Sequence, residues 1–160
     1  MEPLAGLTID AFLQGVASTE PSPGAGSSAG VALAVGISCA RKAVAVTLRH
    51  HPDEEALIGL GSRLSGLTDQ ALAGAEADAT AFRAFIHAVH EERPALLETL
   101  IAVDECLIAI GDEARALLLA VRTDIYPTMT GDVSAALALI AAARTIHAAC
   151  VAESRGQISP

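Results

Sequence analysis

The residue whose surroundings most clearly indicate chemistry is Asp78. In a helix, the positions three and four residues away from it carry small or apolar side chains, namely Gly74, Ala75, Ala81 and Phe82. A carboxylate on or beside an apolar helix face is costly to bury unless it is paired, and such groups are candidates for acid–base catalysis. We therefore take Asp78 as the candidate catalytic residue. An ion pair with Arg83, Arg63 or a second chain explains the same pattern equally well.

The second feature is the segment of residues 18–28, S-T-E-P-S-P-G-A-G-S-S, which precedes a long apolar run. Its prolines restrict the backbone, and its two glycines allow the chain to come close to another group. Ser27 or Ser28 can cap a helix that begins near Ala29. Free N–H groups at such a helix start suit an anion or a developing negative charge. The bare pattern more often marks a stiff connector between two helices, so both interpretations stand at this point.

The only dense cluster of basic residues follows in the same region and consists of Arg41, Lys42, Arg49, His50 and His51. Lys42 is the sole lysine of the chain. Such a patch can hold an anionic ligand tail although the protein as a whole is acidic. Cations at a helix C-terminus, which the macrodipole favours, are the alternative for Arg49 and the two histidines.

Other patterns of reactive side chains do not assemble into a site. The histidine pairs His50-His51 and His87-x-x-His90 lack a matching set of ligands on another helix, so we expect no metal site. A Ser-His-Asp triad would need a nucleophile-elbow motif and a strand to carry it, and the sequence offers neither.

Composition limits the class of protein. The chain has 160 residues, which suits a single domain over residues 1–160, and 52% of them are hydrophobic but only 2% aromatic. The formal net charge of -9 argues against nucleic-acid binding, which needs clustered lysines and arginines. Residues 1–4 contain no basic n-region, so we expect no secretory signal and a cytoplasmic protein.

Two apolar runs, residues 29–48 and 133–152, raise the question of membrane insertion, because the mean hydropathy is +0.47. Charged or titratable residues interrupt both runs, so neither is a clean span of about 20 apolar residues. We expect buried helices of a soluble oligomer and no membrane partner. Cys39, Cys106 and Cys150 lie far apart in apolar helical patterns, and we expect them to be buried free thiols.

The elements that must position these residues are helices. Apolar residues recur at three- and four-residue spacing and no segment alternates with period two, so the sequence predicts an all-α bundle of about five helices without strands. The predicted helices cover residues 9–17, 29–50, 53–92, 94–121 and 132–154. Pro94 suits a first helical turn, and Asp132 is expected to cap or open the last helix.

The order of these features resembles a known family. Residues 12–27, F-L-x-x-V-A-S-x-x-P-S-P-G-A-G-S, are similar to the signature F-L-x-x-L-A-S-x-x-P-T-P-G-G-G-S. That signature opens the formiminotransferase-cyclodeaminase C-terminal family, which includes stand-alone methenyltetrahydrofolate cyclohydrolases. Where this family has Leu-Thr, Asp-x-x-Ala-Phe and Ser-Asp, the chain has Val46-Thr47, Asp78-x-x-Ala81-Phe82 and Gly131-Asp132. The resemblance covers nearly the whole chain.

This resemblance implies a helical bundle that forms a homodimer or larger assembly, with a folate site near the glycine loop and the subunit boundary. It implies either loss of ammonia from formimino-tetrahydrofolate or hydrolysis of methenyl-tetrahydrofolate, so the substrate is a tetrahydrofolate derivative and no separate cofactor is needed. Both reactions require proton transfer at a nitrogen and a positioned nucleophile. Asp78 would be the acid or base, and Asp132 would orient the pterin. Together with Lys42 from the basic cluster, the candidate substrate-binding residues are Pro23, Gly24, Ala25, Gly26, Ser27, Ser28, Lys42, His50, His51 and Asp132.

The sequence also departs from the family pattern in several places. Ala25 replaces the middle glycine of the signature, and His50-His51 replaces two lysines. Cys150 and Ser154 stand where the family has paired asparagines, and the chain ends before the family's final helix. A non-catalytic helical module for oligomerisation or small-molecule binding, which keeps the family fold, is therefore the alternative to a folate enzyme.

Overall fold

The computed structural model describes residues 3–158, and within this range it contains helices and turns but no strand. Five α-helices follow one another in this range: α1 (Ile9–Val16), α2 (Ala25–His50), α3 (Leu60–His87), α4 (Arg93–Ala120) and α5 (Thr130–Ile158). Short 3₁₀ turns cover Leu4–Gly6, His90–Glu92 and Pro127–Met129. The prediction of an all-α fold with about five helices is confirmed.

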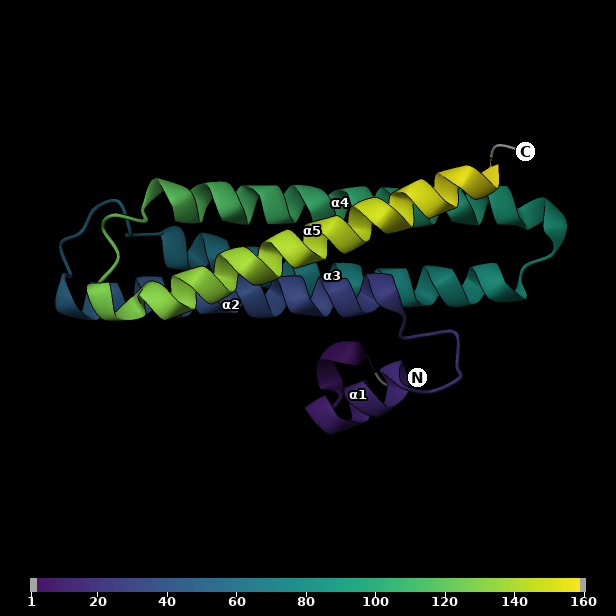
Figure 1. Ribbon diagram of the computed structural model, residues 1–160, viewed down its shortest axis with the longest axis horizontal. Helices are drawn as coiled ribbons and strands as arrows, with labels where there is room; N and C mark the ends of the chain where they lie inside the picture. The colour runs from purple at the N-terminus through teal and green to yellow at the C-terminus, as the bar shows by residue number, and fades with distance from the viewer. Residues whose placement is uncertain (1–2, 159–160) are drawn as a thin grey trace.

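The four long helices form an up-and-down bundle (Figure 1). Helix α2 packs against α3 and α5, and α4 packs against the same two helices. Successive long helices are joined at alternating ends, and α5 crosses the bundle obliquely. The short α1 lies beside the bundle near the start of α2 and has no buried residue.

The core of the bundle consists of small and aliphatic side chains, which let the helices approach closely. A Cβ atom added at Gly30 of α2 would lie 2.8 Å from the Cβ of Ala75 on α3. One added at Gly74 of α3 would lie 2.6 Å from the Leu107 Cδ2 atom of α4. Both helix crossings therefore depend on the missing side chain. By contrast, a Cβ at Gly66 meets no atom within 4 Å.

Two predicted helix starts are wrong. Helix α2 begins at Ala25 rather than near residue 29, because Gly24 is the N-cap and its N–H donates to the Ser27 hydroxyl at 2.9 Å. Helix α3 begins at Leu60 rather than at Asp53. The preceding residues form turns around the fully buried Leu57, and Gly59 has a φ of 84°, a left-handed conformation that glycine adopts without strain.

The later boundaries agree better with the sequence. Helix α3 ends at His87, five residues before the predicted end, because Ala88 and Val89 are extended ahead of the 3₁₀ turn. Helix α4 has Pro94 in its first turn, as predicted. Helix α5 begins at Thr130, and Asp132 lies in its first turn.

Two helices, α2 and the segment Pro127–Ile158, are long and apolar enough to cross a membrane by length and composition. Core helices of soluble proteins meet the same criterion, and both segments are part of the helical bundle. The expectation of no secretory signal was based on residues 1–4, and residues 1 and 2 lie outside the described range. The cysteines are free, as expected, but Cys106 is exposed and Cys39 and Cys150 are half-buried, so the expectation of burial is wrong for Cys106.

Candidate active site

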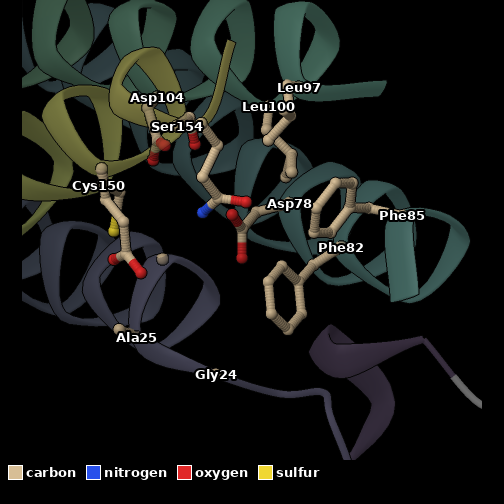
Figure 2. Close-up of a pocket in the computed structure, with 13 residues that line it drawn as sticks. Gly24, Ala25, Asp78, Phe82, Phe85, Leu97, Leu100, Asp104, Cys150 and Ser154 are labelled. Carbon is tan, nitrogen blue, oxygen red and sulfur yellow. The ribbon is translucent and has the colours of Figure 1, made fainter. Parts of the chain in front are cut away.

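A cavity of about 200 Å³ lies where the start of α2 meets α3, α4 and the end of α5 (Figure 2). The carboxyl group of Asp78 points into it, with Phe82 and Phe85 on one side and Cys150 and Ser154 on the other. The residues that line the cavity are Gly24, Ala25, Gly26, Asp78, Phe82, Phe85, Leu97, Leu100, Asp104, Cys150, Glu153, Ser154 and Gln157. The predicted catalytic residue and the glycine loop thus meet in one place.

Gly26 allows the Asp78 carboxylate to lie against the first turn of α2. A Cβ atom at position 26 would lie 2.7 Å from Asp78 Cγ, 2.8 Å from Oδ2 and closer still to Oδ1. Only a residue without a side chain therefore permits the Asp78 carboxylate to rest against the first turn of α2. Hydrogen bonding from the backbone and the side chain of Ser27, in the same turn, lowers the pKa of this carboxyl group. The free N–H groups of a helix start suit a carboxylate in this position.

Burial raises the pKa of Asp78 from 3.8 to about 6, because removal from water disfavours the charged form. The neighbouring Asp104 carboxylate acts in the same direction. The His147 imidazole and the Ser27 hydrogen bonds lower the pKa, but their effect is smaller than that of burial. Asp78 is only 7% exposed. The result is a carboxyl group that exchanges a proton near neutral pH, as acid–base catalysis requires.

Asp104 and His147 form a second, deeper feature of the site. The Asp104 Oδ1 and His147 Nδ1 atoms are 2.7 Å apart, and both side chains are almost fully buried. The other ring nitrogen of His147, Nε2, is buried without a hydrogen-bond partner among residues 3–158. Asp104 also lines the cavity, so this pair connects the polar side of the site to the bundle core.

The cavity has one apolar wall and one acidic side. Phe82, Phe85, Leu97 and Leu100 pack together with Ala81 as a small apolar cluster of their own. The opposite lining includes three carboxyl groups, from Asp78, Asp104 and Glu153, and no lysine, arginine or histidine. Burial raises the pKa of the Cys150 thiol to about 11, with Asp104 and Asp78 adding to the effect, so this thiol is neutral at physiological pH. Such a lining favours a flat apolar ligand that carries a positive charge.

Comparison with known proteins places this arrangement in a family. The sequence matches the formiminotransferase-cyclodeaminase family over residues 8–152. The chain belongs to this family. Its fold also matches the crystal structure of formiminotetrahydrofolate cyclodeaminase from Thermotoga maritima, with a TM-score of 0.90 and 18% sequence identity over 97% of this chain and 81% of that one. A search of curated proteins gives no match.

Within this member of the cyclodeaminase family, the other predicted binding residues lie elsewhere in the chain. Lys42 Nζ and Asp132 Oδ1 pair with each other at 2.9 Å. Lys42 is 15 residues beyond Ser27 on α2, about 22 Å along a helix. The structure thus brings Gly24, Ala25, Gly26 and Ser27 to Asp78, but in a single chain it does not bring Lys42 or Asp132 there.

The two histidines at the end of α2 lie at the same distant end of the helix. The rings of His50 and Tyr126 stack with their centroids 4.1 Å apart, and the His51 ring lies 5.9 Å from that of Tyr126. Pro23 is half-buried ahead of the N-cap, and the Ser28 hydroxyl is buried without a hydrogen-bond partner among the described residues. Binding roles for these residues stay predictions.

The structure removes one of the three ion-pair alternatives for Asp78. Arg63 pairs with Glu113, so it is not the partner of Asp78. Among residues 3–158, no group of three or more His, Cys, Asp or Glu side chains could hold a metal ion. Asp104 and His147 were missed by sequence reasoning, although a signal existed. Each occupies a core position in a three- and four-residue pattern of apolar residues, where a titratable side chain is unusual.

Proposed function

We propose that this protein is an enzyme that acts on the one-carbon unit bridging two nitrogens of a tetrahydrofolate. The observation that carries the proposal is the Asp78 carboxyl group on α3. It lies against the first turn of α2, faces a cavity and has a pKa of about 6. Membership of the cyclodeaminase family supports the choice of substrate class. The formimino and methenyl groups of such substrates are cationic amidines, which suits a cavity lined by three carboxyl groups.

In the deaminating reaction, the free folate nitrogen attacks the carbon of the protonated formimino group and gives its proton to the Asp78 carboxylate. The tetrahedral centre collapses when Asp78 returns this proton to the departing nitrogen, and ammonia leaves with the carbon–nitrogen bond electrons. In the hydrolytic reaction, water attacks the methenyl carbon, and Asp78 passes one proton of this water to the folate nitrogen that is released with the electrons of the breaking carbon–nitrogen bond. The other proton leaves the hydroxyl group for solvent as the formyl carbonyl forms. Both reactions use one group as base and then as acid, which a pKa near the working pH permits.

The rest of the cavity supplies orientation. The wall of Phe82, Phe85 and Leu100 offers an apolar surface against which a pterin or benzoyl ring can pack. Asp104, fixed by His147, keeps a second carboxyl group facing the cavity and raises the pKa of Asp78. A Lys42–Asp132 pair that orients the pterin requires a second chain, since Lys42 lies far along α2 from the Asp78 cavity and Asp132, in the first turn of α5, is paired with it.

We further propose a homodimer in the cytoplasm, built from one domain per chain and needing no separate cofactor. An uncovered apolar stripe on α1 supports self-association, because Ile9, Leu13 and Val16 share one helix face and are 80%, 57% and 41% exposed. Sedimentation equilibrium should then give twice the mass of the chain. A monomer at micromolar concentration would contradict the dimer without affecting the role of Asp78.

The activity is tested with formimino- and methenyl-tetrahydrofolate, since the near-ultraviolet absorbance of the methenyl form reports both reactions. We expect wild type to catalyse at least one of them, and Asp78→Asn to lower kcat by about 10²- to 10⁴-fold. Asp69→Asn is the matched control, because Asp69 is an exposed carboxylate on the same helix. Circular dichroism confirms that both variants fold.

Three results would contradict the proposal or favour another function. Equal rates for wild type and Asp78→Asn would remove Asp78 from the mechanism. No activity with saturable folate binding would favour the small-molecule-binding module, and neither activity nor binding would leave oligomerisation as the function of the fold.

A further inference from the structure

A second hollow lies next to the apolar wall of the cavity at Asp78. Phe85, Leu97 and Gln157 line both this cavity and an open groove of about 490 Å³ at the start of α4. The groove adds a second set of residues, which are His90, Arg93, Pro94 and Ile158. The two spaces therefore adjoin at these three residues, and a ligand long enough to pass over them would contact both.

The two adjoining spaces differ in charge. The cavity is lined by three carboxyl groups and no cationic side chain, whereas the groove is lined by Arg93 and His90 and no carboxyl group. Glu91 and Glu92 are exposed neighbours of Arg93 in the chain but do not line the groove. The site therefore has an acidic end and a basic end, separated by Phe85 and Leu97.

Arg93 is held so that it can accept a ligand. Its Nε–H donates to the Ala88 carbonyl oxygen at 3.3 Å, and its guanidinium carbon lies 5.6 Å from the centre of the Phe85 ring. Within residues 3–158 it forms no salt bridge. Guanidinium has five N–H donors in a planar fork, so the terminal amino groups stay available for a carboxylate.

The size of the cavity requires such an extension. Sites that enclose a drug-sized ligand have volumes of about 300–1,000 Å³, so the cavity of about 200 Å³ can hold only part of a folate. We propose that the groove at Arg93 and His90 binds the carboxylate tail of the folate substrate, while the cationic one-carbon end lies at Asp78. This inference rests on the proposed function and adds to it the direction in which the substrate lies.

Binding measurements with tetrahydrofolate and with tetrahydropteroate, which lacks the glutamate tail, test the assignment. We expect Arg93→Gln to weaken tetrahydrofolate binding about five- to tenfold and to leave tetrahydropteroate binding unchanged, because a partly exposed charged hydrogen bond is lost. The matched control is Arg122→Gln, which removes an exposed arginine just beyond the other end of α4 and should change neither affinity. High salt should reduce the difference between the two ligands in wild type.

The possible failures are distinguishable. If wild type binds neither compound, the proposed function is wrong. If both bind wild type equally, or if Arg93→Gln affects both ligands alike, folate binds but the groove does not recognise the tail, and the assignment is overturned. The assignment is also overturned if Lys42→Gln, rather than Arg93→Gln, removes the preference for tetrahydrofolate, because the tail then lies near the far end of α2.

Discussion

Gly26 is the residue at which the geometry of the site can be tested most directly. In Gly26→Ala, the added Cβ would lie 2.7 Å from the Cγ atom of Asp78 and within 2.8 Å of both carboxylate oxygens. Ordinary van der Waals contact begins at 3.4 Å. Either the α2–α3 contact or the carboxylate must therefore move by about 1 Å, a displacement that can reduce catalysis about 10²-fold.

The carboxylate is the group that should move. It is the end of a short side chain with two rotatable bonds, whereas the close packing of two long helices resists displacement. We therefore expect kcat to fall by about 10²-fold. Overpacking of a core costs about 1–3 kcal/mol of stability. Because the Asp78 side chain can move away from the added Cβ atom, the loss should lie near the lower limit.

The control for this variant is Gly66→Ala. Gly66 lies inside α3, where an added Cβ meets no atom within 4 Å, so the substitution gains helix propensity of up to about 1 kcal/mol without a clash. Stability in urea and activity in the absorbance assay are measured for both variants. Because both replace a glycine in a helix by alanine, the difference in stability between the two variants cancels most of the gain in helix propensity. If Gly26→Ala were as stable and as active as Gly66→Ala, α2 would not lie against Asp78, and the site would be incorrectly described.

Two further predictions concern the buried charges. The folded protein holds the Asp78 proton up to a pKa of about 6, above the 3.8 of the unfolded chain, so stability falls as pH rises from about 4 to 6. Asp78→Asn should therefore be more stable than wild type by about 2–3 kcal/mol above pH 7. The stabilities of wild type and Asp78→Asn are measured in urea titrations at pH 5 and at pH 8. A difference between the two proteins that is the same at both pH values would refute this prediction. His147→Leu leaves the buried Asp104 carboxylate unpaired and should cost about 3–5 kcal/mol, while Asp104→Leu combined with His147→Leu should recover much of the loss. Additive losses in the double-mutant cycle would show that the pair is not coupled.

The fold could be predicted because its signals are local and repeated. Four long segments with three- and four-residue apolar spacing gave the helices, and Pro94 identified the first turn of α4. The predicted start of α3 at Asp53 was wrong. An acidic triplet such as the one at Asp53 is typical of a helix start, but the buried Leu57 and the left-handed Gly59 hold this segment in turns. A tertiary contact of this kind leaves no periodic pattern in the sequence.

The site was predictable only in part. Asp78 was found because a single carboxylate among small residues is visible along one helix. Its partner Asp104 and the buried His147 lie on two other helices, and their pairing depends on how α4 and α5 are aligned. Lys42 was predicted as part of a ligand clamp from charge density alone. The structure pairs it with Asp132, a contact across 90 residues of sequence that local reasoning cannot provide, and its binding role stays a prediction.

Asp78 is subject to two opposing requirements, which explain why several helices must meet at this point. Burial and the Asp104 carboxylate raise its pKa, and if they acted alone the pKa would lie above the value of about 6. His147 and, through Ser27, the first turn of α2 lower the pKa and favour the charged form. That turn can come close enough only because position 26 is a glycine. The glycine signature and the aspartate are 52 positions apart in the chain, yet each is chemically useful only in the presence of the other. A member of this family could lose the middle glycine, as here at Ala25, and keep this contact, but it could not lose Gly26.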